Sequence, residues 1–205
     1  MEKKLVGFLT AMFVVGFLIG IIGEYGAVSS QITDLQRQVS TLQTQILSLQ
    51  GQIETLQSQI STRILGVYFS PDGGCEDQIR YWIRRANSTI HILIYSFTLD
   101  SIGDALIEAY QRGVEVRVVF EKQQITKYSE YLKLKAAGVP VRNDTNPNLM
   151  HNKVMIIDGI IVLTGSFNYS AAGEEENNEN LIVISSLEVA EIYEEEFERI
   201  WIASV

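Results

Sequence analysis

The chain has 205 residues, which is enough for one compact domain of ordinary size and some accessory segments. Its 16 basic and 25 acidic residues give a formal net charge of −9 at pH 7. This balance excludes a protein that coats itself with nucleic acid, because non-specific affinity for nucleic acid rests mainly on neutralisation of phosphates by Lys and Arg. The single cysteine, Cys75, excludes an intrachain disulfide bond.

The first predicted element is an uncharged segment of 19 residues, from Leu5 to Gly23. At about 1.5 Å per residue, a helix of this length nearly spans the ~30 Å hydrocarbon core of a bilayer. The length favours an uncleaved transmembrane anchor, residues 1–27, over a cleaved signal peptide that would leave the protein secreted or periplasmic. Two lysines precede the segment and Glu24 follows it. The positive-inside rule therefore predicts a single-pass protein of the cell membrane with a cytoplasmic N-terminus and an extracytoplasmic C-terminal part.

Residues 28–63 are predicted to form a parallel coiled-coil stalk. β-Branched residues occupy every a position and leucine nearly every d position of a heptad repeat, the pattern that parallel two-stranded coiled coils prefer. Glutamine fills the e and g positions, so no salt bridge selects a different partner, which suits a homodimer. A solvated helical spacer is the alternative, but a spacer has no need of an uninterrupted apolar seam. The a positions are Ile32, Val39, Ile46, Ile53 and Ile60, and the d positions are Val28, Leu35, Leu42, Leu49 and Leu56.

Residues 64–205 are predicted to form an α/β domain, because apolar strand segments alternate with helical segments. The run from Thr89 to Phe97 is nearly continuous in apolar residues, which indicates a strand buried on both faces. His91, which lies in that run, is therefore predicted to be a structural histidine. The expected helices are Glu76–Ala86, Ser101–Arg112 and Lys127–Ala137, and the other expected strands are Leu65–Ser70, Val114–Glu121 and Val139–Arg142.

A negatively charged chain needs a local basic patch if it is to attract an anionic substrate. A solvated helix face explains several basic side chains of this domain equally well. The expected patch consists of Lys122, Lys127, Lys133, Lys135 and Arg142.

The segment from Leu149 to Asn168 is predicted to be a β-hairpin around which the rest of the domain is organised. Two runs rich in Val and Ile flank Asp158-Gly159, and a two-residue Asp-Gly loop is a strong hairpin signal because both positions tolerate positive φ. In this register Met155 faces Val162, and side chains alternate between the two faces of each strand. His151, Lys153, Ser166 and Asn168 are thus expected on one face, and Val154, Ile156, Ile161 and Leu163 on the other.

The four polar side chains of this hairpin suit the binding of a phosphoryl group. An imidazole can attack phosphorus or protonate a leaving oxygen. A fixed cation, a hydroxyl and an amide can stabilise the charge of a pentacoordinate transition state. This chemistry requires no metal ion and no cofactor.

Two motifs of the hairpin, HxKxxxxD and GSxN, resemble the signature of the phospholipase D superfamily. The first consists of His151, Lys153 and Asp158, and the second of Gly165, Ser166 and Asn168. The resemblance covers residues 64–205, where VYFSPDGG, IYSFT, RGVEVRVVFE, GVPVRND and NNEN follow in the order found in the small, single-motif bacterial endonucleases of that superfamily. It implies an α/β fold with a mixed sheet flanked by helices.

The resemblance also implies the roles of the site residues. His151 would be the nucleophile, and Glu179 matches the glutamate that accepts the second ring N–H of the catalytic histidine and so fixes its tautomer. The groups expected to hold the phosphate oxygens are Lys153, Ser166 and Asn168. The motif residues expected to be structural are Asp158, as a turn-former, Gly159 and Gly165.

The chain after the hairpin is predicted to be a polar loop over the site, Ala171–Asn180, followed by the strand Leu181–Ser185 and an amphipathic helix from Leu187 to Trp201. The acidic run Glu174–Glu176 invites interpretation as a metal site. No further ligand spacing supports that interpretation.

The chain holds one HxK motif, whereas cleavage through a phosphohistidine needs one imidazole as nucleophile and another as general acid. In the resembled superfamily two motifs meet across a two-fold axis, and a parallel coiled coil imposes such an axis on two identical chains. The sequence therefore predicts a membrane-anchored, homodimeric phosphodiesterase acting on nucleic acid, either DNA or RNA. Hydrolysis of phospholipid headgroups is one alternative, and a catalytically inactive, membrane-tethered binding protein is another.

Overall fold

The computed structural model of the protein describes residues 2–60 and 62–205. Met1 and Ser61, which belong to the predicted anchor and stalk, lie outside the described residues. The chain divides into two compact units, Met1–Gln57 and Ser58–Val205. The first unit is helical, and the second unit contains all the strands that the described residues form.

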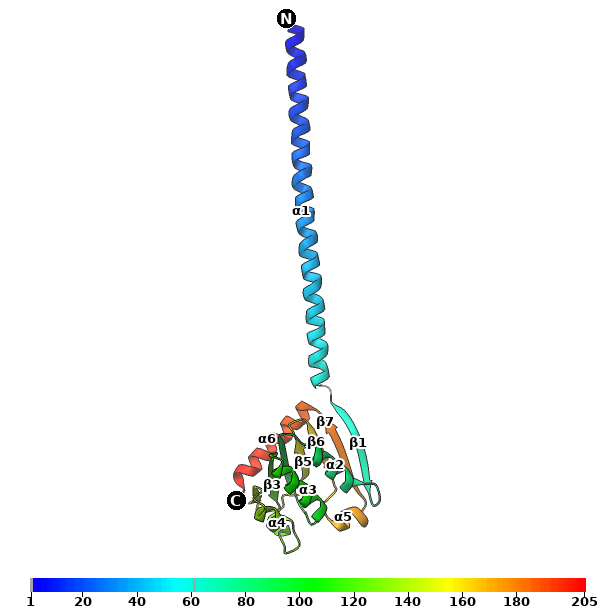
Figure 1. The fold of residues 1–205 in the computed structure, drawn as a ribbon, viewed down its shortest axis with the longest axis vertical. Coiled ribbons are helices and arrows are strands. Elements are labelled where there is room, and N and C mark those ends of the chain that lie inside the picture. Colours follow the sequence, from blue (N-terminus) through cyan, green and yellow to red (C-terminus); the bar gives the residue numbers. More distant parts are fainter. Residues whose placement is uncertain (1, 61) are drawn as a thin grey trace. The chain divides into compact units, whose positions relative to one another are not determined.

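The N-terminal unit belongs to a single continuous helix of 59 residues, α1 (Glu2–Ile60), coloured blue to cyan in Figure 1. By length and composition this helix could cross a membrane, with a mean hydropathy of 1.8 over its apolar window. It passes residue 27 without a break, so the predicted anchor and stalk are successive parts of one helix. In the single chain the predicted seam is at least half exposed at Val28, Ile32, Leu35, Val39, Leu42, Ile46, Leu49, Ile53 and Leu56.

The C-terminal unit is built on a mixed seven-stranded sheet in the order β1-β7-β6-β5-β2-β3-β4. β2 pairs with β3 and β3 with β4 in parallel, whereas the other neighbours are antiparallel. This arrangement confirms the predicted α/β class with a mixed sheet. The strands are β1 (Arg63–Ser70), β2 (Thr89–Ile94), β3 (Glu115–Phe120), β4 (Val141–Asn143), β5 (Lys153–Ile157), β6 (Ile161–Gly165) and β7 (Glu179–Ser185).

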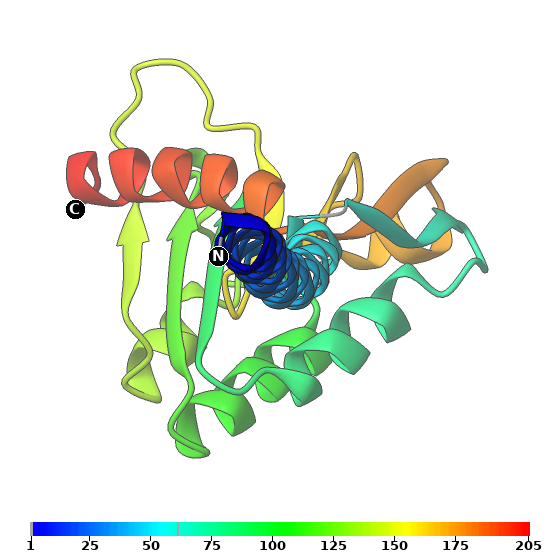
Figure 2. The same ribbon diagram turned by 90° about the horizontal axis from the view of Figure 1, so that it is seen from above.

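Helices cover both faces of this sheet. In Figure 2, α6 lies on one side of the strands, and α2 and α3 lie on the other. The larger core, on the α2 and α3 side, includes Val118, whereas the smaller core under α6 joins Val119 to Phe197. Successive residues of the central strands thus enter different cores, which leaves no exposed face there for a site. The helices are α2 (Cys75–Arg85), α3 (Asp100–Gln111), the 3₁₀ turn η1 (Lys122–Gln124), α4 (Tyr131–Ala136), α5 (Ala171–Glu175) and α6 (Leu187–Ala203).

The hairpin of β5 and β6 differs by one residue from the predicted register. Its loop has three residues, Asp158 to Ile160, because the N–H of Ile160 donates to the carbonyl of Ile157 at 3.1 Å across the turn. The Asp-Gly signal itself is correct, since Asp158 and Gly159 adopt positive φ angles of 53° and 63°. Met155 therefore pairs with Leu163 and not with Val162.

A register slip of one residue moves every side chain of a strand to the opposite face. Ile161 and Leu163 consequently share the α2 and α3 core with Met155, while Val162 packs under α6. The predicted grouping of Ile161 and Leu163 with Val154 and Ile156 is wrong. The predicted polar face is wrong for the same reason, and the site lies at the ends of the strands instead.

The predicted helix Lys127–Ala137 is too long, because α4 begins only at Tyr131. Thr126 stabilises turns before that point: its hydroxyl accepts from the N–H of Tyr128, and its carbonyl accepts from the N–H of Ser129. These turns take the backbone groups that a longer helix would use.

The predicted loop Ala171–Asn180 is also partly wrong. Ser170 accepts a hydrogen bond from the N–H of Gly173 at 3.2 Å and so caps the short helix α5. The strand that follows begins at Glu179, two residues earlier than predicted, because β7 pairs there with Ser70 of β1. This pairing places Glu179 in the sheet.

Candidate active site

Several strands end at the same edge of the sheet, and the predicted site residues lie at or beside these ends. Lys153 is the first residue of β5 and Gly165 is the last residue of β6. Glu179 opens the antiparallel neighbour β7. Ile94, the last residue of β2, pairs with Lys153, so Tyr95 reaches the same edge. The structure thus brings the predicted residues to one edge by strand topology, although not to one face.

His151 and Lys153 form the centre of this edge together with Tyr95. The His151 side chain is exposed, whereas Lys153 is 7% exposed. The Lys153 amine lies 3.1 Å from His151 Nδ1, and it donates to the His151 carbonyl at 2.9 Å. The Tyr95 ring contacts both, with its centroid 4.3 Å from the imidazole centroid and 4.7 Å from the amine. The lysine is therefore fixed against the imidazole by hydrogen bonds and a cation–π contact.

Burial lowers the pKa of the Lys153 amine to about 8, although the negative charge of Glu179 acts in the opposite direction. At neutral pH the amine therefore remains mostly charged and available to an anionic phosphate. A charged amine has only donors, so His151 Nδ1 accepts from it in this arrangement. The proton of the neutral imidazole then sits on Nε2.

The GSxN turn is fixed by Asn180, a residue that the sequence did not single out as part of the site. The Asn180 carbonyl accepts from the N–H groups of Ser166 and Phe167 at 3.1 and 3.2 Å. Ser166 Oγ in turn accepts from the Asn180 backbone N–H at 3.1 Å and from its side-chain amide at 3.2 Å. With two donors already directed at Ser166 Oγ, its own hydroxyl proton is free to donate to a ligand oxygen.

Gly165 permits this close approach. Its φ of 153° is one that residues with a side chain rarely adopt, and a Cβ at this position would lie 2.1 Å from the Asn180 carbonyl oxygen. Glycine at this motif position is therefore a steric requirement of the Ser166 turn.

Asn168 and Glu179 complete the edge without contacting His151. Asn168 Oδ1 is buried and has no hydrogen-bond partner among the described residues. The Glu179 carboxylate accepts from the Asn177 amide at 3.2 Å. Within the described part of one chain it makes no hydrogen bond to His151. The predicted orienting role of Glu179 therefore stays a prediction.

Asp158 lies at the opposite end of β5 from Lys153 and acts on backbone structure. Its carboxylate accepts from the N–H groups of Asn87, Ser88 and Thr89 at 2.7 to 3.1 Å. Burial by itself would raise the pKa of Asp158, but these backbone donors outweigh it and hold the pKa below its usual value. This geometry agrees with the predicted structural role and ties the hairpin loop, including Gly159, to the start of β2.

Several residues of the predicted basic patch have local partners in the structure. Lys133 pairs with Asp100, Asp104 and Glu130 at 2.8 to 3.1 Å. Arg142 lies over the ring of Trp201, 4.3 Å from its centroid. Of the predicted set, Lys122 approaches the site, since it donates to the carbonyl of Asn146 in the loop before His151. Sequence distance alone could not show that these cations have local partners.

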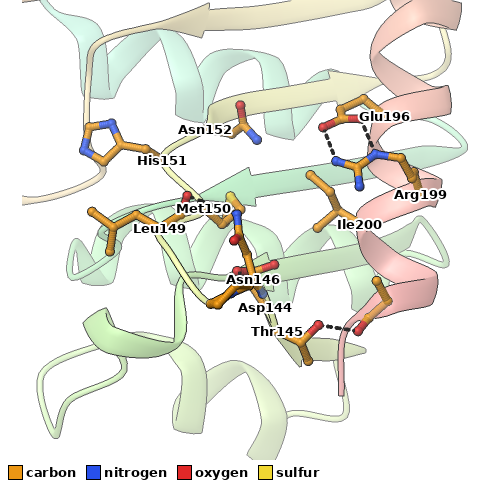
Figure 3. A pocket seen from close by; sticks show the side chains of 12 residues that line it. Asp144, Thr145, Asn146, Leu149, Met150, His151, Asn152, Glu196, Arg199 and Ile200 are labelled. Atoms are coloured by element: carbon orange, nitrogen blue, oxygen red, sulfur yellow. Dashed lines mark hydrogen bonds and ion pairs between the residues drawn. The ribbon is translucent and has the colours of Figure 1, made fainter.

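His151 also forms part of the wall of a hollow of about 640 Å³ between the loop 144–152 and α6. Figure 3 shows His151 at one end of this hollow and Arg199 with Glu196 at the other. The Arg199 guanidinium makes two bonds of 2.7 Å to the Glu196 carboxylate. The one lysine or arginine in the lining is therefore already paired, and this wall has little attraction for a polyanion.

Among the described residues there is no group of three or more His, Cys, Asp or Glu side chains that could hold a metal ion. In the run Glu174–Glu176, Glu174 accepts instead from the backbone N–H of Glu76 at 3.0 Å.

A family model described as "Cardiolipin synthase, PLD-like domain" matches residues 79–201. The chain belongs to the phospholipase D superfamily. It is 40% identical over 126 residues to a phospholipase D of Rickettsia felis, a match that covers 61% of this chain and 63% of that protein. It is 32% identical over 118 residues to a mitochondrial cardiolipin hydrolase of Xenopus tropicalis, with 57% of this chain and 56% of that protein covered. The chain thus spans less than two thirds of the length of these curated relatives.

The fold of the phospholipase D superfamily is also found in solved structures. Nuc, a phospholipase D family member from Salmonella typhimurium, superposes with a TM-score of 0.66 at 32% sequence identity. The superposition covers 71% of this chain and 97% of Nuc. The relatives named for an activity are hydrolases of phosphodiester bonds, which is the reaction class that the superfamily indicates.

Proposed function

We propose that the protein hydrolyses phosphodiester bonds through a phosphohistidine on His151. The observation that carries this proposal is the clustering at one sheet edge of an exposed imidazole with the amine of Lys153 3.1 Å away. The same end of the sheet carries the Ser166 hydroxyl, whose proton is free to donate to a phosphate oxygen.

The reaction requires the ring proton of His151 to move from Nε2 to Nδ1. For Nε2 to attack phosphorus, Nδ1 must carry the ring proton, so the Lys153 amine must leave Nδ1 and move to a phosphate oxygen. Glu179 is the proposed acceptor of the Nδ1 proton, from the same chain or from a second one. The bond from phosphorus to the leaving oxygen then breaks, and a second imidazole protonates that oxygen. Water, deprotonated by the same imidazole, finally cleaves the phosphorus–nitrogen bond.

We propose that a second copy of the chain supplies the second imidazole. Two apolar surfaces support this dimer: the exposed seam of α1 and a row on β1, an edge strand of the sheet. Val67 and Phe69 occupy alternate positions of β1, beyond the register shift between Ile64 and Gly66, and therefore share one face, with exposures of 49% and 61%. Phe69 pairs with Asn180, so the row reaches the residue that fixes Ser166. An exposed apolar row on an edge strand is typical of an interaction surface.

The proposed organisation is a membrane anchor (residues 1–27), a coiled-coil stalk over the rest of α1 (28–60) and a catalytic domain that begins with β1 at Arg63, so the predicted end of the stalk at residue 63 is too late. The lysines before the apolar segment support an extracytoplasmic catalytic domain. Protease treatment of sealed vesicles tests the orientation, and protection of the domain on the cytoplasmic side would contradict it.

For the substrate we propose nucleic acid, supported by 32% identity to nearly the whole of Nuc and by the predicted likeness to small endonucleases. Three observations favour a second candidate substrate, the headgroup bond of a phospholipid. Lys133 of the expected basic patch is paired with carboxylates, the domain is acidic, and the relatives at 40% and 32% identity are named for phospholipids.

The test uses the full chain in detergent and in the presence of EDTA, with three substrates: bis(p-nitrophenyl) phosphate, a labelled oligonucleotide and phospholipid vesicles. We expect turnover that His151→Asn abolishes. If the protein cleaves the phospholipid of the vesicles but not the oligonucleotide, phospholipid replaces nucleic acid as the proposed substrate. Phosphate-dependent binding without turnover of any substrate would indicate an inactive, membrane-tethered binding protein and contradict the proposal.

A further inference from the structure

The residues that hold His151 in place come from a segment that the motifs do not include. β3 ends at Phe120, and the chain continues through Glu121 into the 3₁₀ turn η1. The N–H of Glu121 donates to the carbonyl of Ile94 at 3.1 Å, which fixes this segment beside the end of β2. It therefore lies next to Tyr95, the first residue after β2.

Glu121 is a fully buried carboxylate, with an exposure of 0%. Its Oε2 accepts from the N–H of Met150 at 2.7 Å, and its Oε1 accepts from the N–H of Gln123 at 3.0 Å. The described residues provide no cation as a partner for it. Burial of an unpaired carboxylate is costly, and the two N–H bonds offset part of that cost. One of these bonds holds the backbone N–H of Met150, the residue before His151.

The same turn holds the other side of the imidazole. Gln124 Nε2 donates to the Tyr95 hydroxyl at 3.1 Å, and the Tyr95 ring lies against the His151 ring. The N–H of Tyr95 also donates to the carbonyl of Asn152 at 3.0 Å, on the residue after His151. The backbone on both sides of His151 and one face of its ring are thus bonded to elements outside the HxK motif.

We infer that Glu121, Gln124 and Tyr95, here named the bracket, are positioning residues for His151. The inference rests on the proposed phosphohistidine function, because it explains how an exposed imidazole keeps one orientation for attack. A purely structural role explains the burial of Glu121 equally well. It does not explain why contacts of the bracket fall on three successive residues, Met150, His151 and Asn152.

The first readout needs no turnover. The chain has two histidines, so selective ¹⁵N labelling of the full chain in detergent yields two imidazoles for NMR. Glu121→Gln replaces one acceptor by an NH₂ group and places two donors against each other. Tyr95→Leu removes the ring but retains an apolar side chain. Both variants should change or broaden the His151 signals and leave those of His91 unchanged. Glu194→Gln, which removes the carboxylate 2.6 Å from His91 Nδ1, should do the reverse.

The second readout is the rate of bis(p-nitrophenyl) phosphate hydrolysis. Misplacing a reacting group by about 1 Å costs roughly 100-fold in rate, so Glu121→Gln and Tyr95→Leu should lower kcat by one to two orders of magnitude with little change in KM. Tyr95→Phe retains the ring and loses one neutral hydrogen bond, so it should recover most of the rate and lose about fivefold. Gln124→Leu breaks the same bond, and combining it with Tyr95→Phe should cause no further loss. Tyr81→Leu, which removes a tyrosine under Arg85 outside the site, is the matched control and should keep wild-type kcat.

Unchanged His151 signals in both Glu121→Gln and Tyr95→Leu would overturn the bracket whether or not the protein turns over substrate. A loss of kcat that follows the loss in Tm across the bracket and control variants alike would overturn it too. Perturbed His151 signals in a chain that hydrolyses none of the substrates would leave the bracket standing and contradict the proposed function.

Discussion

The two histidines of the chain occupy contrasting regions of one sheet. His91 lies inside β2 under α6, with 5% exposure, and stacks on Phe197 with 4.6 Å between ring centroids. Its Nδ1 lies 2.6 Å from the Glu194 carboxylate, and its Nε2 accepts from Arg117 at 2.8 to 3.0 Å. His151 also contacts an aromatic ring, but it is exposed and binds the Lys153 amine through Nδ1 alone.

The contrast bears on the proposal that His151, and not His91, reacts with a substrate. Both nitrogens of His91 are occupied by charged partners, so no lone pair is available to a substrate. Within the described residues Nε2 of His151 has no hydrogen-bond partner, and solvent reaches the ring. Stacking on an aromatic ring is common to both and therefore does not distinguish the two roles. The access of solvent to the ring and the adjacent amine of Lys153 do distinguish them.

The largest expected effect separates the two histidines by substitution. His151→Asn should lower turnover by at least about 10³-fold, as expected for removal of a nucleophile, with little change in thermal stability. His91→Asn should lower the free energy of unfolding by about 2 kcal/mol, because Glu194 and Arg117 lose their buried partner, while turnover per folded molecule is retained. Steady-state kinetics and thermal unfolding of both variants test this prediction. Loss of turnover in a His91→Asn protein that is fully folded would contradict a purely structural role of His91.

A second large effect tests the two-chain mechanism. When wild-type and His151→Asn chains are co-expressed and form mixed dimers, activity should fall as the square of the wild-type fraction, because each cycle needs both imidazoles. Activity measured over a series of mixing ratios distinguishes this from a linear fall. A linear dependence would show that one chain suffices.

The Gly165 position should be much more sensitive than the hairpin glycine. Gly165→Ala drives a Cβ to within 2.1 Å of the Asn180 carbonyl and should cost about 3 kcal/mol of stability as well as displace Ser166. Gly159→Ala meets no atom within 4 Å and should cost only about 1 kcal/mol, from its positive φ. Chemical denaturation of both variants measures the difference, and equal costs would contradict the proposed fit against Asn180.

The smallest expected effect is on pH dependence. Lys153 must be charged to hold a phosphate oxygen, and burial lowers its pKa to about 8, so the rate should decline as the pH rises through about 8. The charge of Glu179 raises this pKa, so Glu179→Gln should move the decline to lower pH. A pH profile of kcat/KM for both proteins provides the check. A decline at the same pH in both would remove Glu179 from the surroundings of the amine.

The sequence predicted the features that depend on local chemistry. The Asp-Gly pair placed a turn at Asp158, and the apolar run around His91 indicated a buried strand; both are confirmed. The register of the hairpin could not be predicted. Residues 160 and 161 are both isoleucine, so the sequence does not show which of them begins the second strand. The hydrogen bond from the N–H of Ile160 to the carbonyl of Ile157 keeps Ile160 in the loop.

Long-range partners were equally inaccessible to sequence patterns. The bonds of Glu121 to Met150 and of Asn180 to Ser166 join residues that are distant in the chain, and they form only when strand order brings those segments together. The segments IYSFT and NNEN, which contain Tyr95 and Asn180, carried a signal in their likeness to the superfamily. The pairing of Lys133 could not be predicted for the same reason, because two of its three carboxylate partners, Asp100 and Asp104, come near it only after folding.

The measurement that tests the central claim most directly is isolation of the covalent intermediate. Full-length protein is mixed with a substrate carrying ³²P at the scissile phosphate, denatured in alkali to preserve a phosphorus–nitrogen bond, digested and analysed by mass spectrometry. The account predicts the labelled phosphoryl group, still esterified to the part of the substrate that does not leave, on the peptide containing His151, and no label in the His151→Asn protein. Rapid turnover with no label on His151, or with label on another residue, would contradict it.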